Sequence, residues 1–153
     1  MDVFNYILHH KGVESEKSIP YNISKTVCAV EQNQQRIGAI DDYCARGNLF
    51  SVNGKPEVLA DEDIQRVIHE FGPVYTTIDA KDLTFKNLLG GVYENANCST
   101  KTNHAVTIVG WDPESWHIKN SWGIRWADAG YFRMKRHSNT CGVKNYITFP
   151  IVN

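Results

Sequence analysis

One histidine in this sequence is placed where it could transfer a proton. His104 opens an apolar, β-branched run that ends at Trp111, and Asn120 ends the next such run, 16 residues after the histidine. A hairpin between the two runs would bring both side chains together. The amide oxygen of Asn120 could then accept the Nδ1–H of the imidazole and leave Nε2 free to work, while Trp122 shields this hydrogen bond from water. A neutral amide orients the ring without adding charge, which suits a histidine paired with an anion.

The same histidine could instead be a core residue or a metal ligand. A lone histidine at the start of a strand is usually structural, and only the spacing to Asn120 favours a catalytic base. The other histidines show no ligand set. Two are adjacent on a helix and point about 100° apart, one lies on a helix beside Glu70 and is expected at the surface, and the last two have no acidic or cysteine cluster nearby. In chain order, these histidines are His9, His10, His69, His117 and His137. The four cysteines contain no CxxC pair, so neither a metal nor a cofactor is predicted.

The composition predicts a folded chain with a substantial core. The 153 residues are 42% hydrophobic and 11% aromatic, which is enough apolar surface for one domain. The formal net charge of −1 comes from interspersed charges, so a nucleic acid is not expected as a partner. No apolar run approaches the ~18 residues of a membrane span, and no membrane partner is expected. The first residues also lack the charged and apolar regions of a signal peptide.

Two amphipathic helices are predicted from the spacing of apolar residues. Residues 2–11 and 61–71 each place apolar side chains on one helical face. We expect Asp61 to be the N-cap of the second helix, and Gly72 to end it. Residues 13–58 are polar and irregular, and they are expected to form extended loops held by disulfides.

After residue 73 the pattern changes to short β-branched and aromatic runs separated by turn residues. A short helix is expected near residues 82–88. Strands that are consecutive in sequence predict an antiparallel sheet, and the helices before them predict an α+β fold. The expected strands are Val74–Ile78, Ala105–Trp111, Trp116–Asn120, Tyr131–Lys135 and Tyr146–Ile151.

Several ordered motifs resemble one known family. NHAVTIVGW followed by WHIKNSWG and WADAGYF is similar to the second half of a papain-family cysteine peptidase. The loop GVESEKSIPY, the segment FGPVYTTIDA and the segment NTCGV also resemble that family, in the family's order. The stretch around Asp42-Tyr-Cys44 is similar to the mite digestive peptidases and allergens within it. The resemblance covers essentially all 153 residues.

The resemblance implies a role for each residue of the site. His104 would be the catalytic histidine, Asn120 the residue that orients it, and Trp122 their cover. Ala105 would line the S2 pocket with Thr77 on its wall, and Tyr146 would lie at its floor. A tyrosine there shortens the pocket, so we expect medium aliphatic P2 side chains to be preferred over large aromatic ones.

The nucleophile of this family is not found in the chain. In the family the cysteine lies in a C-G-[SA]-C-[WY] segment about 130–150 residues before the histidine. Only 103 residues precede His104, none of the four cysteines is followed by an aromatic residue, and no glutamine stands in the oxyanion position. We therefore expect a papain-like α+β fragment. Residues 1–58 would be the remnant of the left-hand helical domain, and residues 59–153 a nearly complete right-hand domain with a barrel-like antiparallel sheet.

The resemblance also implies a disulfide and a cellular context. It pairs Cys98 with Cys141, and it places the partners of Cys28 and Cys44 in the missing half, with a Cys28–Cys44 bond as the alternative. Sequons at Asn22 and Asn97 are compatible with glycosylation. The family is secreted or resides in lysosomes or digestive vacuoles.

Two functions follow from these patterns. The first is a papain-like cysteine peptidase that is present as a fragment and is inactive without its nucleophile. The alternative is a non-catalytic binding module that keeps the substrate cleft. Under the first reading the expected partners are peptide or protein substrates, the missing N-terminal half of the fold, and cystatin-type inhibitors.

Overall fold

The computed structural model describes residues 2–22, 24, 36–47 and 58–152. The chain divides into two compact units, Met1–Tyr43 with Pro150–Asn153, and Cys44–Phe149. The domain boundary expected near residue 58 borders residues 48–57, which lie outside the described part of the chain. No helix in the described ranges is long and apolar enough to cross a membrane.

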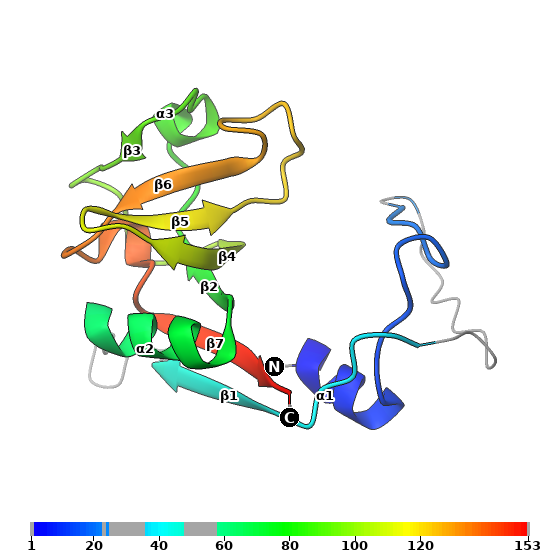
Figure 1. Ribbon diagram of the computed structural model, residues 1–153. Helices are drawn as coiled ribbons and strands as arrows, with labels where there is room; N and C mark the ends of the chain where they lie inside the picture. The colour runs from blue at the N-terminus through cyan, green and yellow to red at the C-terminus, as the bar shows by residue number, and fades with distance from the viewer. Residues whose placement is uncertain (1, 23, 25–35, 48–57, 153) are drawn as a thin grey trace. The chain divides into compact units, whose positions relative to one another are not determined.

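A seven-stranded sheet organises the larger unit (Figure 1), with the strand order β1-β7-β2-β4-β5-β6-β3. The pairs β2–β4, β2–β7, β4–β5 and β5–β6 are antiparallel, and β3–β6 is parallel. The predicted antiparallel sheet of an α+β fold is thus confirmed. The strands are β1 (Asp42–Gly47), β2 (Val74–Ile78), β3 (Val92–Tyr93), β4 (His104–Trp111), β5 (Ser115–Lys119), β6 (Tyr131–Lys135) and β7 (Tyr146–Ile151), and the helices are α1 (Asp2–His10), α2 (Asp61–Phe71), α3 (Leu83–Lys86) and the 3₁₀ turn η1 (Thr140–Gly142).

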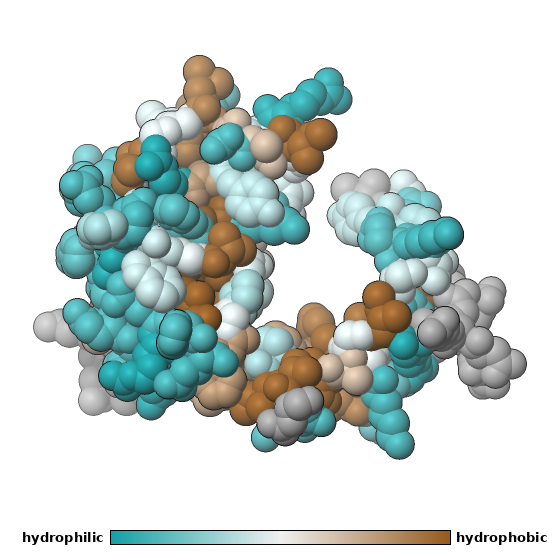
Figure 2. Space-filling model, in the orientation of Figure 1, coloured by the Kyte–Doolittle hydropathy of each residue, from teal (hydrophilic) through white to brown (hydrophobic). Residues whose placement is uncertain are grey.

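Helix α2 has the bounds that its apolar spacing predicts. Its inner face buries Ile64, Val67 and Ile68, and its outer face is hydrophilic in Figure 2. Gly72 ends it with φ of 90°, where its N–H donates to the Ile68 carbonyl at 3.0 Å. The expected N-cap is wrong: Ala60 occupies that position, and the Asp61 side chain pairs with cations of other elements instead.

Three short elements differ from the prediction. β1 lies in the segment that was expected to be loop, because its six residues show no alternation of apolar side chains. β3 has only two residues, too few for a sequence pattern. The third helix is confined to Leu83–Lys86, because the Asp82 side chain accepts the Thr84 N–H and sets the start of the helix.

Aromatic side chains fill the core of the larger unit beneath the β4–β5–β6 region. Phe85 is fully buried, and its ring centroid lies 5.1–5.4 Å from those of four other rings. These rings belong to Tyr93, Trp122, Trp126 and Phe132. In the smaller unit, α1 is held by Phe4, which stacks on Tyr43 at 5.4 Å.

Candidate active site

The β4–β5 hairpin brings His104 and Asn120 together. Asp112 shapes the turn, because its carboxylate accepts the N–H groups of Glu114 and Ser115 at 2.8 and 2.7 Å. A β-bulge between Ile108 and Gly110 then shifts the register by one residue. Bulges commonly re-aim side chains in this way, and here the bulge sets which residue of the β5 end faces the start of β4.

His104 and Asn120 are joined by a short hydrogen bond. The Nε2 atom of the imidazole lies 2.8 Å from the Oδ1 atom of Asn120. The pairing was predicted, but the nitrogen was not: the bond uses Nε2 rather than Nδ1, and Nδ1 has no hydrogen-bond partner among the described residues. Because the amide oxygen accepts, Nε2 carries the proton and Nδ1 presents its lone pair. The nitrogen available for chemistry is therefore Nδ1.

Both partners are held in place by their surroundings. Asn120 is 9% exposed, and its Oδ1 also accepts the Ser121 N–H at 2.8 Å. The ring of Trp122 lies 4.9 Å from that of His104, tilted by 36°. Trp122 in turn packs on the buried Phe85, so the cover over the histidine is anchored in the core. Trp122 keeps 37% of its surface exposed, which leaves it accessible to a substrate.

The three residues expected at the S2 pocket come from three adjacent strands. Thr77 and Ala105 are direct register partners across β2 and β4. Tyr146 begins β7, whose Ile147 pairs with Thr76 on β2. The Thr77 and Tyr146 hydroxyls are buried without a hydrogen-bond partner among the described residues.

A further tyrosine borders this row of residues. Burial raises the pKa of the Tyr75 hydroxyl above its ordinary value, and Tyr146 adds to the rise. A cavity of about 300 Å³ is lined by Tyr75, Ala105, Asn120 and their neighbours. Thr77 and Tyr146 do not line this cavity. The cavity therefore includes Asn120 and one of the three predicted S2 residues, Ala105, but His104 does not line it.

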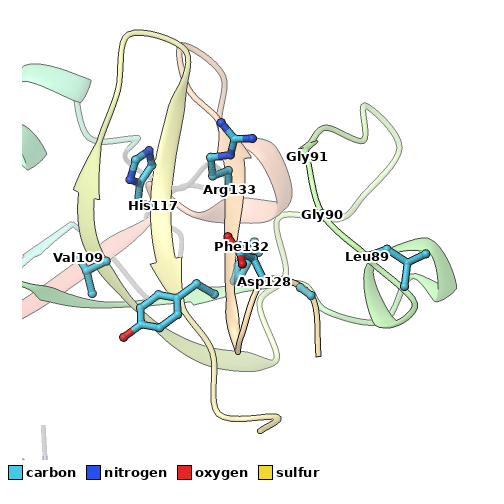
Figure 3. A pocket seen from close by; sticks show the side chains of 10 residues that line it. Leu89, Gly90, Gly91, Val109, His117, Asp128, Phe132 and Arg133 are labelled. Carbon is cyan, nitrogen blue, oxygen red and sulfur yellow. The ribbon is translucent and has the colours of Figure 1, made fainter. Parts of the chain in front are cut away.

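A larger cavity of about 450 Å³ lies elsewhere on the sheet (Figure 3). Figure 3 shows Val109, His117 and Arg133 on three neighbouring strands, with Leu89 on a separate loop. None of its lining residues belongs to the His104–Asn120 pair. Size alone therefore does not mark the reactive part of this molecule.

Two histidines that were expected to lie away from any acidic or cysteine cluster each have one carboxylate beside them. His117 Nε2 lies 2.8 Å from Asp112 Oδ2, and His137 Nδ1 lies 3.2 Å from Asp61 Oδ2. The hydrogen bond from His117, followed by those from Ser115 and the turn backbone, holds the pKa of Asp112 well below its usual range. Asp112 is only five residues from His117, so the hairpin could have suggested that pair, whereas Asp61 is distant in sequence.

Asp79 and Asn103 lie next to the candidate site, and their pairing was missed from the sequence. Asp79 is buried at the end of β2, and its carboxylate accepts a hydrogen bond from Asn103 Nδ2. Asn103 directly precedes His104. The position of Asn103 beside a candidate catalytic residue was a signal that the sequence offered. Its partner Asp79 lies 24 positions away, and a local sequence pattern does not show a pairing at that distance.

The remaining predicted residues are placed as follows. The disulfide between Cys98 and Cys141 is confirmed. Cys44 has a free thiol, and Cys28 lies outside the described residues, so the alternative bond between these two stays a prediction. Asn22 and Asn97 are both exposed, as glycosylation would require. Within the described ranges no group of three or more His, Cys, Asp or Glu residues could hold a metal ion.

The sequence matches one protein family along nearly its whole length. The family described as papain family cysteine protease matches residues 1–151. Digestive cysteine proteinase 3 of Homarus americanus is 36% identical over 156 residues, which cover 97% of this chain and 44% of the lobster protein. The chain thus spans less than half the length of this curated relative.

Solved structures of similar proteins share the fold. The digestive procathepsin L2 proteinase from Tenebrio molitor larval midgut matches with a TM-score of 0.81 and 32% identity, covering 99% of this chain and 46% of that one. The Carica candamarcensis cysteine protease CMS1MS2, solved in complex with E-64, matches with a TM-score of 0.82 and 28% identity, covering 98% of this chain and 66% of that one. Both matches cover nearly all of this chain.

Proposed function

The chain belongs to the papain family of cysteine proteases, and we propose that it carries the His–Asn part of a Cys–His–Asn site for peptide-bond hydrolysis. The observation that carries this proposal is the 2.8 Å bond between His104 Nε2 and Asn120 Oδ1. It holds the ring in one tautomer and leaves Nδ1 without a hydrogen-bond partner among the described residues. A general base must have such a nitrogen within reach of the proton that it takes.

In the proposed reaction His104 transfers one proton in each of two steps. Nδ1 accepts the proton of a cysteine thiol, which gives a thiolate–imidazolium pair. The thiolate attacks the carbonyl carbon of the peptide, and the imidazolium returns the proton to the leaving amine. Water then attacks the thioester: His104 accepts a proton from the water and passes it to the departing cysteine sulfur, which releases the acid product and the free thiol. Throughout, Asn120 keeps Nε2–H bonded, so the ring does not rotate between the two transfers.

The nucleophile and the oxyanion glutamine are proposed to come from a part of the fold that this chain does not span. Cys98 and Cys141 are joined to each other, so neither is a thiolate. Neither Cys28 nor Cys44 is followed by an aromatic residue, unlike the family's nucleophile. The chain alone is therefore proposed to be inactive, and the N-terminal half of the fold is its proposed partner.

Trans-complementation tests this function. The chain is refolded with the part of the lobster proteinase that it does not span, which supplies the cysteine, and cleavage of fluorogenic dipeptides is followed. We expect cleavage that disappears when that cysteine is replaced by serine in the supplied part. Because Tyr146 closes the proposed S2 pocket, Val or Leu at P2 should be cleaved faster than Phe.

The same assay separates the alternative function. A non-catalytic binding module would bind the peptide in the complemented state without cleaving it, and binding would not depend on His104. Peptide binding by fluorescence anisotropy, with no turnover, would overturn the catalytic proposal. A preference for Phe at P2 would overturn only the assignment of Tyr146. Secretion or lysosomal residence, glycosylation at Asn22 and Asn97, and inhibition by cystatins are proposed with the same function.

A further inference from the structure

The loop that leads into His104 is fixed by one buried carboxylate. Asp79 directly follows β2 and is 7% exposed. Its Oδ2 accepts the Ser99 N–H at 3.2 Å, and its Oδ1 accepts the Lys81 N–H at 3.2 Å and a hydrogen bond from Asn103 Nδ2. Donors from both sides of the loop therefore converge on a single side chain. No ion pair of Asp79 is found in the described part of the chain.

Asn103 passes this constraint to the histidine. Its side-chain oxygen accepts the Ala80 N–H at 3.0 Å while its Nδ2 donates to Asp79. Its own N–H donates to the Ile78 carbonyl at 2.9 Å. Ile78 and His104 are the last register pair of β2 and β4. Because the backbone and the side chain of Asn103 are both held, the direction of the following Cα–Cβ bond of His104 is held as well.

A carboxylate at this position needs an explanation, because burying an anion without a cation is costly. The cost is offset only when hydrogen bonds saturate the charge. An asparagine in place of Asp79 would keep one acceptor oxygen, and its amide would face a donor N–H. A carboxylate alone can accept from Lys81, Ser99 and Asn103 at once. The charge is thus required for ordering the loop, and the loop ends at His104.

We propose that Asp79 is a positioning residue for His104 that acts through Asn103. The inference rests on the proposed function, since it concerns the base of that reaction. Asn120 fixes the rotation of the imidazole from the end of β5, and Asp79 fixes the backbone that carries the ring. With Asn120 and Asp79 both in place, the orientation of Nδ1 is fixed, and we expect this atom to face the side from which the thiol approaches. Loss of Asp79 would leave the ring held only by the hydrogen bond to Asn120 and by its contact with Trp122.

Chemical modification of the full 153-residue chain tests the positioning role. Diethylpyrocarbonate acylates unprotonated imidazole nitrogens, and peptide mass spectrometry reports the rate at each of the six histidines. In Asp79→Ala the rate at His104 should rise by about 3- to 10-fold, the population change expected from losing one net hydrogen bond. The acylation rates at His69 and His117 should stay within about twofold of their values in the unsubstituted chain, a change smaller than the loss of one hydrogen bond would give.

Asp82→Ala is the matched control. The Asp82 carboxylate also accepts the N–H of the residue two positions on, Thr84, and an asparagine Nδ2, that of Asn95. It holds a different loop, so its loss should leave the rate at His104 unchanged. Asp79→Asn, which keeps the size of the side chain, is the second variant if Asp79→Ala unfolds the chain. An unchanged rate at His104, or an equal rise at all histidines in both Asp79 variants, would overturn the proposal.

The complemented enzyme gives an independent reading. Misplacing a catalytic group by a fraction of an ångström to an ångström lowers kcat by about 10- to 100-fold, with KM nearly unchanged. We expect this pattern in Asp79→Asn and not in Asp82→Asn. Equal loss in both variants would count against Asp79. If the unsubstituted protein cleaves nothing, the proposed function fails, while the acylation rates still decide whether Asp79 positions His104.

Discussion

Two polar clusters of this molecule use their hydrogen-bonding groups in opposite ways. At Asp61 both carboxylate oxygens are engaged: Lys144 Nζ lies 2.8 Å from Oδ1, and Oδ2 accepts the His137 N–H at 3.0 Å. Arg136 Nε lies 3.4 Å from Oδ2 as an ion pair, although this nitrogen makes no hydrogen bond among the described residues. At His104 the pairing stops short. The Nδ1 atom of the imidazole and the Nδ2 atom of Asn120 have no partner among the described residues.

The difference separates stability from reactivity. A buried charge without a partner lowers stability, so a cluster that serves only folding pairs its charges with one another. A reactive site must keep at least one donor or acceptor available for the substrate or the nucleophile. Substitutions in the Asp61 cluster should therefore change folding with little effect on chemistry, and substitutions at His104 should do the reverse.

The largest effect is expected from His104→Ala. In the complemented enzyme kcat/KM should fall by about 10²- to 10⁴-fold, the usual contribution of a general acid–base. Unfolding in urea should be almost unchanged, because the ring is only half-buried. His117→Ala is the control, since His117 is also hydrogen-bonded to one oxygen but lies outside the site. Comparable losses of activity in the two variants would contradict the distinction between the clusters.

Asp61→Ala should have the next largest effect, and on stability alone. The substitution leaves Lys144 and Arg136 buried without their anion, and breaking a buried pair costs about 3–5 kcal/mol in the free energy of unfolding. Urea denaturation measures this loss. Asp63→Ala, on the same helix with an exposed ion-pair partner in Arg66, should cost less than about 1 kcal/mol. An activity loss in Asp61→Ala at temperatures where the protein stays folded would show that the two clusters are coupled.

Asn120→Ala should reduce activity less than His104→Ala. The base is retained, but its ring can rotate away from the productive direction, and we expect kcat to fall by about 10- to 100-fold. The reacting nitrogen distinguishes the two ring assignments. Because Nε2 is bonded to Asn120, heteronuclear NMR of the unsubstituted chain should show His104 protonated at Nε2, and Asn120→Ala should mix the tautomers. A proton on Nδ1 before substitution would reverse the proposed geometry.

The contrast between the clusters also explains what the sequence could predict. The helix 61–71 and most strands were predicted because apolar periodicity is a local signal, and Asn120 was found because one hairpin relates it to His104. The nitrogen was predicted wrongly, because either ring nitrogen of a histidine can donate to an amide oxygen and the spacing to Asn120 does not distinguish them.

Long-range pairing was not predictable in the same way. Asp61 was expected to cap its own helix, but its partners Lys144 and Arg136 lie more than 70 positions away, and a side chain that can cap locally gives no sign of a distant partner. Asp79 escaped notice for the same reason. Both carboxylates act where the fold brings distant segments together, so their roles become visible only once the sheet order is known.

The smallest effect is expected at Asp112, where the contrast can be tested by acid. Its pKa lies below the ordinary 3.8, first because His117 donates to it. A lowered pKa stabilises the folded state above the unfolded pKa, and this contribution is lost as the pH falls through the folded value. The difference in unfolding free energy between the unsubstituted chain and Asp112→Asn should thus be full near about pH 6 and shrink below about pH 4.

Salt should distinguish this carboxylate from Asp61. The ion pair of Asp112 with His117 is partly exposed, with 32% and 44% of the side-chain surfaces accessible, so about 1 M salt should weaken it. The pKa of Asp61 is also lowered. Burial by itself raises this pKa, but the hydrogen bonds from Lys144 and the His137 backbone and the charges of Lys144 and Arg136 together outweigh that rise. Because that cluster is buried, the stability lost on acidification of Asp61 should change little with salt. If salt changes the stability difference between the unsubstituted chain and each variant equally in Asp61→Asn and Asp112→Asn, then water screens both carboxylates alike. Burial would then not protect the ion pairs of Asp61.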